Sequence, residues 1–444
     1  MDVLEQARET MLLLLTMPFG PGWGELLFRF VPFVLFLELP VYLLILLGAL
    51  RHALRRDFAT PRACTQFPRV TCLVTCYNEG EAVARTITSL AEQRYPGFIE
   101  IIPLVDGAIQ NHRTYAAARA MEPVVRRMAN RSLRVVPKWQ RGGAVSSLNL
   151  GLQLATGEVV LAVDGDTSFD NDMVHHMACH FNDPAVIGVA GNLRVRNAGV
   201  NLLTRLQALE YLLAINVSRV GQGEFGVVHV ISGALGGFRR SFLEKMGGYD
   251  SGTAQDGDIT LRMKHYFGRH PHLRLVFEPR AIGHTDAPEN WRTFFRQRQR
   301  WDGDLYYLYI RKHSRSFLPR LQGWKNVILQ VWTGLYFQMV IPYIIIIYST
   351  AVFVLFPPGV VLGTWAMVYL LYTLINGLLF AVHMALFSER PGADWRLVWL
   401  LPLQPLFMFL QRVNNALATL KQMTCSAHLD SSMAPWWVLR KSRF

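Results

Sequence analysis

Long apolar segments at both ends of the chain set the strongest limit on its fold. Leu26–Leu50 contains only two charged residues, Arg29 and Glu38, and is long enough to cross the roughly 30 Å of hydrocarbon in a bilayer. Two further apolar segments, Leu329–Phe356 and Val360–Phe387, are separated by a Pro-Pro-Gly turn. We therefore expect a membrane protein in which a water-soluble domain lies between hydrophobic blocks.

A third C-terminal segment, Trp395–Leu420, contains prolines and polar residues that leave its role open. These residues are Pro402, Pro405, Gln411, Arg412, Asn414 and Asn415. Such a segment either lines an aqueous path or enters and leaves the membrane on one side. Three full spans would place the C-terminus outside, whereas Arg440, Lys441 and Arg443 indicate a cytoplasmic tail. The sequence does not decide the number of spans.

Charges beside the apolar segments predict their orientation. The chain has 45 Lys and Arg against 32 Asp and Glu, a net charge of +13. Basic residues gather directly after the first apolar segment: Arg51, His52, Arg55, Arg56, Arg62 and Arg69. This pattern is typical of a cytoplasmic flank, and it argues against nucleic acid as the partner. The acidic first residues are not typical of a signal peptide, and Met11–Phe19 is too short to span, so residues 1–25 are interpreted as an amphipathic or interfacial segment.

The cysteines favour a reducing compartment. Five cysteines are too few and too scattered for a disulfide framework. Cys72 and Cys76 lie four residues apart in a strand-like run, so they share one face and are expected in the core rather than in a zinc site. We expect free thiols in a domain that faces the cytosol.

Residues 69 to 287 alternate between short β-rich runs and helical stretches. The expected strands are Val70–Cys76, Glu100–Val105, Leu133–Val136, Val159–Val163, Val186–Ala190 and Val227–Ser232. The expected helices include Ala82–Gln93, Arg113–Met128 and Ser146–Ala155. This alternation predicts an α/β domain with a mostly parallel sheet and crossover helices. Its ligand site should lie beyond the carboxyl ends of the strands.

An acidic triplet, Asp164-Gly165-Asp166, follows one of these strands directly. Two carboxylates at a strand end can share one Mg²⁺ or Mn²⁺, which keeps oxygen ligands and bridges substrate phosphates. Such an ion neutralises the charge that develops on a diphosphate leaving group. The alternative is an acidic surface turn.

Further polar residues follow other predicted strands. Glu79 and Asp106 could accept hydrogen bonds from a base or ribose, or could simply cap helices. Arg141 precedes two glycines that would let the backbone approach a phosphate, although a plain turn fits equally. Asp256 is a candidate general base; Asp258 nearby could do no more than cap a helix.

Residues 288 to 328 form a basic and aromatic stretch. Gln297, Arg300 and Trp301 make a Gln-x-x-Arg-Trp motif within it. Aromatic residues recur here at helical spacing among arginines, which is typical of a helix lying on a membrane surface. An ordinary surface helix is the alternative.

In this order and spacing, the elements from about Pro68 to Lys312 resemble the processive family 2 glycosyltransferases of membranes. That group includes bacterial synthases of poly-N-acetylglucosamine, cellulose, hyaluronan and chitin oligosaccharide. The resemblance implies an α/β GT-A-type glycosyltransferase domain combined with transmembrane and interfacial helices. It assigns Glu79 and Asp106 to the uridine, and Asp164 and Asp166 to nucleotide and metal.

The resemblance also assigns acceptor-side roles. Asp256 would be the catalytic base, and Gln297, Arg300 and Trp301 would close over the diphosphate and the acceptor sugar. Three departures weaken any assignment of the sugar: Gln255 replaces an acidic residue, the family's lysine near Arg141 is not apparent, and the residues after Gly107 differ. Trp437–Arg440 resembles a gating element of hyaluronan synthases, or anchors the tail at the interface.

The expected division of the chain is an interfacial segment at 1–25, a transmembrane helix at 26–50, the cytosolic domain at 51–287, interfacial helices with the motif at 288–328, a transmembrane region at 329–424 and a basic tail at 425–444.

We expect a multi-pass protein of the bacterial inner membrane. It would polymerise a β-linked exopolysaccharide from a UDP-sugar, with UDP-N-acetylglucosamine favoured, and translocate the product. Its partners would be the UDP-sugar donor, the growing polysaccharide acceptor, the lipid bilayer and accessory secretion subunits.

Three alternatives stay open. The first is a cellulose-, hyaluronan- or chitin-type synthase that uses another UDP-sugar. The second is a transferase of one sugar to a lipid carrier, which would need no Gln-x-x-Arg-Trp motif. The third is a non-catalytic channel or scaffold subunit, in which the acidic residues would be expendable.

Overall fold

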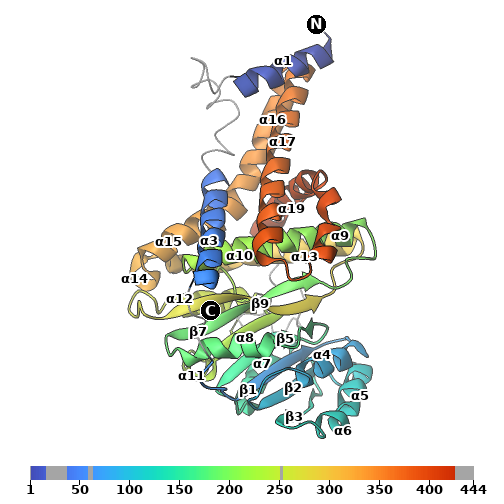
Figure 1. Cartoon of the computed structure of the whole chain (residues 1–444), viewed down its shortest axis with the longest axis vertical. Coiled ribbons are helices and arrows are strands. Elements are labelled where there is room, and N and C mark those ends of the chain that lie inside the picture. Colours follow the sequence, from blue (N-terminus) through green and yellow to red (C-terminus); the bar gives the residue numbers. More distant parts are fainter. Residues whose placement is uncertain (1, 17–37, 59–63, 251–253, 426–444) are drawn as a thin grey trace.

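The computed structural model describes residues 2–16, 38–58, 64–250 and 254–425. A sheet with flanking helices forms one end of the molecule, and a helical layer covers one side of it and extends away (Figure 1). The first half of the expected first span, residues 26–37, lies outside the described residues, as do 17–25 and the tail with Trp437–Arg440. The described part of that span belongs to helix α3, Leu39–Phe58.

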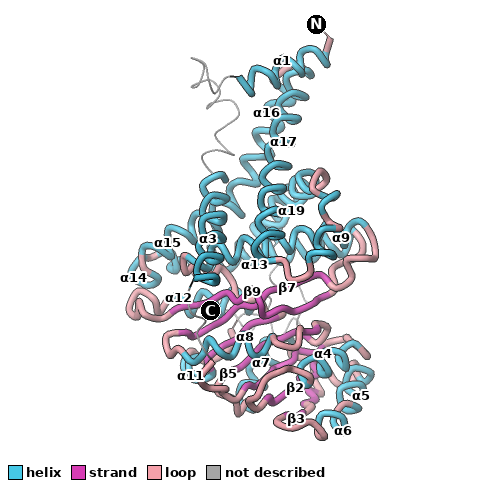
Figure 2. Tube along the Cα trace, viewed as in Figure 1, coloured by secondary structure: helices cyan, strands magenta, loops and turns pink. Residues whose placement is uncertain are grey.

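The described residues contain one nine-stranded sheet, drawn in magenta in Figure 2. Its order is β3-β2-β1-β5-β8-β7-β9-β6, and β4 also pairs with β2. The strands are β1 Val70–Cys76, β2 Ile99–Asp106, β3 Arg131–Leu133, β4 Val136–Lys138, β5 Val159–Asp164, β6 Ser168–Phe169, β7 Val186–Val195, β8 Leu235–Arg239 and β9 Arg274–Thr285. Strands β1 to β5 pair in parallel, but β8 is antiparallel to both β5 and β7.

The sheet is therefore mixed, and two expected strands differ from the observed ones. The expected strand Leu133–Val136 spans the break between β3 and β4, and the expected strand Val227–Ser232 is wrong. Residues 227–232 form an irregular segment and no strand. Their apolar residues Val227, Val228 and Ile231 are nevertheless buried, which explains why the run resembled a strand. The strand lies a few residues later, at β8. A Cβ at its Gly237 would lie 2.9 Å from the Met177 side chain and 3.0 Å from that of Leu161, closer than ordinary van der Waals contact. Glycine therefore lets these two side chains pack closely against β8.

Two hydrophobic clusters cover the two faces of the sheet, and β1 contributes to both. Cys72, Val74 and Cys76 point to one face and Leu73 to the other, as the period of two along a strand requires. Both cysteines are buried, which confirms their expected place in the core. The helices of this domain are α4 Ala82–Ala91, α5 His112–Ala120, α6 Glu122–Val125, α7 Gly143–Leu154, α8 Met173–Cys179, α9 Leu202–Glu210, α10 Ser218–Glu224, α11 Arg240–Lys245 and α12 Gln255–Lys264.

The helical layer contains two helices that are long and apolar enough to cross a membrane. They run over Trp324–Leu355 and Pro358–Phe387, close to the bounds expected from the sequence. The individual elements here are α13 Trp291–Tyr306, α14 Pro319–Gln322, α15 Trp324–Gln330, α16 Ile341–Leu355, α17 Pro358–Val382, α18 Pro391–Trp395 and α19 Gln404–Cys425. Helices α16 and α17 point away from the sheet, and α1, Val3–Thr16, lies across their far end (Figure 1).

From Gln404 onward, the third apolar segment forms the amphipathic helix α19, whose polar side chains have partners. In α19, Arg412 pairs with the buried Glu38 at 3.2 Å, and Tyr372 donates to the same carboxylate at 2.5 Å. Gln411 donates to Glu210 at 2.9 Å, and the Asn414 side chain accepts from Gln299 at 3.2 Å. These polar residues face neighbouring helices because buried polar groups require partners.

The expectation that all cysteines are free thiols is wrong for one pair. Cys64 and Cys179, 115 residues apart in the sequence, form a disulfide with a Cα–Cα distance of 5.2 Å. Spacing alone could not reveal it, because α8 comes to lie beside the segment that enters β1 only when the sheet has formed.

Candidate active site

Three carboxylates converge beyond the ends of the adjacent strands β1 and β5. Thr75 stands opposite Asp164 in the sheet and donates its hydroxyl to that carboxylate at 3.2 Å. The next residue, Gly165, packs so closely that a Cβ there would lie 3.3 Å from the Glu79 carboxyl carbon. The turn after β1 therefore places Glu79 beside the acidic triplet, at the edge of the sheet where a ligand site was predicted.

Burial and mutual repulsion favour the protonated form of these three carboxyl groups when no cation is bound. Burial raises the pKa of Asp164 to about 7, and the charge of Asp166 adds to the effect. Burial also raises the pKa of Glu79 to about 7 and raises the pKa of Asp166. The Oε2 atom of Glu79 is buried without a hydrogen-bond partner among the described residues.

This donor set suits a hard divalent cation. Within the described residues, however, the acidic side chains do not form a group of three ligand atoms within 4.8 Å of one another. An ion that takes few protein carboxylates, and completes its shell with water and substrate phosphates, fits this arrangement.

Asp106, at the end of β2, organises the neighbouring turn. Its carboxylate accepts hydrogen bonds from Lys138 Nζ at 2.6 Å and from the amides of Gly142 and Gly143, each at 2.8 Å. These donors hold the start of α7 in place. The Arg141 guanidinium lies over the Tyr77 ring, 4.2 Å from its centroid, so the Asp106 and Glu79 turns are neighbours. Contact of Asp106 with a uridine stays a prediction.

Lys138 was not recognised from the sequence. It is the last residue of the three-residue strand β4 and contacts Ser146 and Ser147 as well as Asp106. The sequence did show a basic residue three positions before Arg141, which could have marked it as a candidate site residue.

Asp256 lies at the start of α12, within electrostatic reach of the acidic triplet. Its carboxylate accepts hydrogen bonds from the amides of Gly257 at 2.8 Å and Gly233 at 3.4 Å. Burial raises the pKa of Asp256, and its charge is one of the causes that raise the pKa of Asp164. Arg219, a residue not predicted from the sequence, opposes the rise at Asp256.

Asp258 has a different role. Its side chain is fully buried and pairs with Lys312 at 2.9 Å and His313 at 2.7 Å. Lys312 is the last residue of the helical run that contains the Gln-x-x-Arg-Trp motif, and His313 follows it. Asp258 therefore joins α12 to the end of that run, and Asp256 is the carboxylate with no such ion pair among the described residues.

The motif residues lie on α13, which packs against α19. Trp301 is 40% exposed, and its ring lies under the Arg298 guanidinium, which also pairs with Glu210 at 2.9 Å. Gln297 Oε1 is buried without a partner among the described residues. Among the described contacts, the ion pairs of Asp258 connect α12, which carries Asp256, to the end of this helical run. The side chains of Gln297 and Trp301 do not make this connection.

Residues 71–247 match the model of glycosyl transferase family 2. The chain carries a family 2 glycosyltransferase domain. The match includes Glu79, Asp106, Arg141 and both aspartates of the triplet, whereas Asp256 and the motif on α13 lie beyond it. The expected family 2 glycosyltransferase domain is thereby confirmed for residues 71–247, and the roles of the individual residues stay predictions.

The names of two curated relatives are consistent with a family 2 glycosyltransferase domain. A poly-beta-1,6-N-acetyl-D-glucosamine synthase from Staphylococcus epidermidis is 30% identical over 238 residues, 53% of this chain and 54% of that protein. An N-acetylglucosaminyltransferase from Rhizobium leguminosarum bv. viciae is 29% identical over 265 residues, 56% of this chain and 59% of that protein. The chain thus spans just over half the length of the curated relatives it matches.

A solved structure confirms the fold of the domain. A mannosyltransferase from Pyrobaculum calidifontis, in complex with GDP-Man and Mn²⁺, matches 86% of this chain and 99% of its own with a TM-score of 0.52. Its sequence is 19% identical, so the likeness concerns the fold alone. The expected GT-A-type architecture is confirmed, with a mixed sheet.

Proposed function

We propose that this chain is a processive inverting glycosyltransferase that builds a β-linked exopolysaccharide from a UDP-sugar and passes it across the bacterial cytoplasmic membrane. The observation that carries the proposal is the convergence of Glu79, Asp164 and Asp166 at one sheet edge, with Asp256 in electrostatic reach. Buried carboxylates of raised pKa grouped in this way are typical of functional sites.

Asp164 and Asp166 would hold a divalent cation, Mg²⁺ or Mn²⁺, against the donor diphosphate. When bound, the cation supplies positive charge to the diphosphate as it leaves. The protein supplies the rest of the donor site. Glu79 offers an unpartnered oxygen for the nucleoside, and the amides held by Asp106 fix the turn that presents Arg141.

In the transfer step Asp256 accepts the proton from an acceptor hydroxyl. That oxygen forms a bond to the anomeric carbon as the bond from this carbon to the diphosphate breaks, and UDP departs. The attack inverts the configuration of that carbon. Two backbone amides fix the orientation of the Asp256 carboxylate, so little reorganisation is needed as it takes up the proton.

The acceptor end of the polymer would lie at α13. Trp301 is 40% exposed and would stack on a sugar ring, while Arg300 suits the diphosphate. The two long apolar helices would then lie in the membrane beside the transfer site. The domain that carries the acidic site would face the cytosol, where UDP-sugars are made available.

UDP-N-acetylglucosamine is the favoured donor because two of the named relatives are described by N-acetylglucosamine products or transfer. Cellulose-, hyaluronan- and chitin-type products with other UDP-sugars remain the second candidate. Transfer of one sugar to a lipid carrier is less well supported, because it gives no role to the exposed Trp301. A silent channel or scaffold subunit would not need the buried acidic group.

The test is to incubate the purified full chain in lipid nanodiscs with radiolabelled UDP-N-acetylglucosamine, UDP-glucose or UDP-glucuronic acid, with Mn²⁺ or Mg²⁺. We expect polymer from the first donor and none in excess chelator. Asp166→Asn should abolish polymer while the protein stays folded in membranes. The matched control is Asp172→Asn, an exposed aspartate at the start of α8, which should stay active.

Each alternative gives a different result in this experiment. Polymer from another donor replaces the proposed substrate but keeps the reaction. A single labelled sugar that extracts with lipid indicates the lipid-carrier transferase. Full activity in chelator removes the role of Asp164 and Asp166, and no turnover of any donor, with wild type and Asp166→Asn alike, favours a scaffold.

A further inference from the structure

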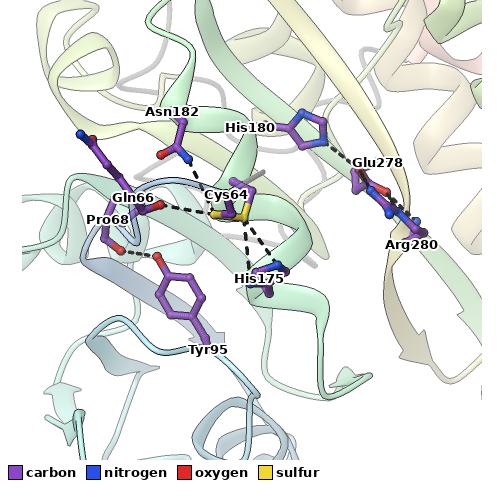
Figure 3. The surroundings of a disulfide bond; sticks show 10 residues. Cys64, Gln66, Pro68, Tyr95, His175, His180, Asn182, Glu278 and Arg280 are labelled. Carbon is purple, nitrogen blue, oxygen red and sulfur yellow. Dashed lines mark hydrogen bonds and ion pairs between the residues drawn. A yellow bond between two sulfur atoms is a disulfide. The ribbon is translucent and has the colours of Figure 1, made fainter. Parts of the chain in front are cut away.

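A second group of metal-ligating side chains lies away from the acidic site. Cys64, His175 and Cys179 each offer one ligand atom, and these atoms all lie within 4.8 Å of one another. Cys64 precedes β1, whereas His175 and Cys179 are one turn apart on α8. Figure 3 shows Cys64 beside His175. Within the described residues this is the one group of three or more such atoms at that spacing.

These residues differ from the core cysteines in their access to solvent. Cys72 and Cys76 are almost completely buried, and burial raises the pKa of both thiols, which keeps them protonated and inert. Cys64, His175 and Cys179 are only partly buried. Small thiols, phosphines and metal ions can therefore reach this group but not the core pair.

We propose that Cys64, His175 and Cys179 form a transition-metal site of the zinc type, which is available when the Cys64–Cys179 disulfide is reduced. Two sulfur ligands and one imidazole select a metal such as Zn²⁺ over Mg²⁺, because Mg²⁺ prefers oxygen ligands. Disulfides are uncommon in the cytosol, so the dithiol is the form expected for a domain on that side. The proposal does not depend on the transfer reaction.

The distances agree with tetrahedral coordination. Zinc bonds of about 2.3 Å to sulfur and about 2.0 Å to nitrogen place these two ligand atoms roughly 3.6 Å apart. His175 Nε2 lies 3.7 Å from Cys179 Sγ. The helix therefore already presents two ligands at the required separation. Reduction frees Cys64 Sγ to move to the roughly 3.8 Å that separates two thiolates on one zinc ion.

The neighbouring groups also fit. The side chain of Asn182 donates to Cys64 Sγ at 3.7 Å, which favours a thiolate there. The Phe67 and Tyr95 rings lie 6.0 and 6.5 Å from that of His175 and limit its rotation. Two other polar groups lie close by, as Figure 3 shows. Gln66 O, 3.3 Å from Cys64 Sγ, would accept the thiol proton before metal binding, and His180 is held by Glu278 at 2.7 Å. Water would complete the shell.

Opening the site is a balanced two-electron reaction. A water-soluble phosphine attacks one sulfur, the S–S bond breaks, and the phosphorus atom is oxidised. Water then supplies the oxygen of the phosphine oxide and the protons of the two thiols. Metal binding next displaces the protons from Cys64 and Cys179. Either the disulfide or the metal would fasten the segment that enters β1 to α8.

The experiment uses the full chain in detergent, reduced with tris(2-carboxyethyl)phosphine and titrated with Co²⁺ under argon. Co²⁺ reports its ligands, because thiolate coordination produces a sulfur-to-metal charge-transfer band that carboxylates do not. We expect this band to saturate at one Co²⁺ per chain and to disappear when one equivalent of Zn²⁺ is added. The unreduced protein should give no band.

Variants then assign the ligands. Cys179→Ser should abolish the band, and His175→Asn should weaken binding and change the visible spectrum. The matched control is His176→Asn, next to it on α8 and outside the group, which should bind Co²⁺ as the wild type does. The proposal is overturned by no band after complete reduction, by a band that persists in Cys179→Ser, or by a disulfide that resists the phosphine. None of these results depends on transferase activity.

Discussion

At the scale of single residues, the surroundings of Asp256 suit a proton acceptor. Two amides fix its carboxylate, and its neighbour Asp258 carries the ion pairs to Lys312 and His313. We predict that Asp256→Asn lowers turnover by about 10²- to 10⁴-fold, the usual contribution of a general base, and leaves UDP affinity unchanged. Polymer synthesis and UDP calorimetry on the same preparation measure the two effects.

The control for this variant is Glu244→Gln on α11, which exchanges an exposed carboxylate and should change neither quantity. Near-normal turnover in Asp256→Asn would move the base elsewhere.

Asp256 should also determine how turnover depends on pH. Burial raises the pKa of Asp256 above its ordinary value of 3.8. The base must be ionised, so turnover should fall as the pH drops through this raised pKa, because the carboxyl group then already holds a proton. A profile of kcat against pH should place its acid limb above pH 3.8. A limb at or below that value, with the protein still folded, would contradict the assignment.

Lys264 provides a test of stability that is separate from catalysis. It is 3% exposed, and burial lowers its pKa from 10.5 to about 7. The unfolded chain therefore binds a proton that the folded chain does not between these values, and stability is lost as the pH falls from about 10.5 to 7. We predict that Lys264→Met stabilises the fold at pH 7 by on the order of 1–3 kcal/mol.

Thermal melts of both proteins at pH 7 and pH 9.5 check this. The gain in melting temperature should be larger at pH 7. Lys245→Met at the end of α11, on the exposed side of the domain, is the control and should change little at either pH.

Strand-end residues could be predicted from the sequence, whereas the groups around them could not. Glu79, Asp164 and Asp166 each follow a β-rich run, so their place at one sheet edge comes from the strand pattern alone. Lys138 and Arg219 lie in a three-residue strand and within a helix. Their closeness to Asp106 and Asp256 arises only from tertiary packing, which the spacing of residues along the chain does not reveal.

At the scale of elements, strands with a regular apolar pattern were predicted well and irregular ones were not. The predicted bounds of β1 are exact, and those of β5 differ by one residue. In contrast, β6 has two residues and β8 contains two glycines, so neither shows the usual β-propensity. These strands make the sheet antiparallel in part, which explains why a mostly parallel sheet was expected.

Helix α13 provides the prediction at this scale. Its Trp301 ring is partly exposed and lies beside Arg298. We predict that Trp301→Ala impairs elongation more than UDP binding, because the ring would hold the acceptor sugar. Polymer length and UDP affinity are to be measured together. Trp291→Ala, at the other end of the same helix and similarly exposed (44% against 40%), is the matched control for loss of an aromatic side chain.

If Trp301 instead serves only to anchor α13, the variant should lose stability and activity in parallel. A stable Trp301→Ala protein that makes full-length polymer at the normal rate would exclude the acceptor role.

At the scale of the whole molecule, Asp394 joins the sheet to the base of the long apolar helices. It pairs with Arg194 of β7 at 3.1 Å, and it accepts hydrogen bonds from Ser388 at 2.8 Å and His383 at 2.9 Å. We predict that Asp394→Asn destabilises the protein by about 3–5 kcal/mol, because it leaves the buried Arg194 without its counter-charge.

Denaturation by heat or guanidinium in detergent measures this loss. Asp286→Asn removes the partner of Arg196 in a more exposed pair and should cost about 0–1 kcal/mol. Equal losses in the two variants would mean that Asp394 does not join the two parts. An Arg194→Met and Asp394→Leu double variant should recover most of the stability, because both charges are then removed.

The sheet order has a consequence for synthesis on the ribosome. Strand β6, which follows the acidic triplet, pairs with β9, and β5 pairs with β8. The donor site is thus incomplete until Thr285 has been added, roughly 200 residues after β1 begins, which takes about 10–40 s at about 5–20 residues per second. For that time the acidic triplet would lack its partner strands. Nascent chains arrested before β9 should therefore fail to bind donor even though every donor-side residue has already been made.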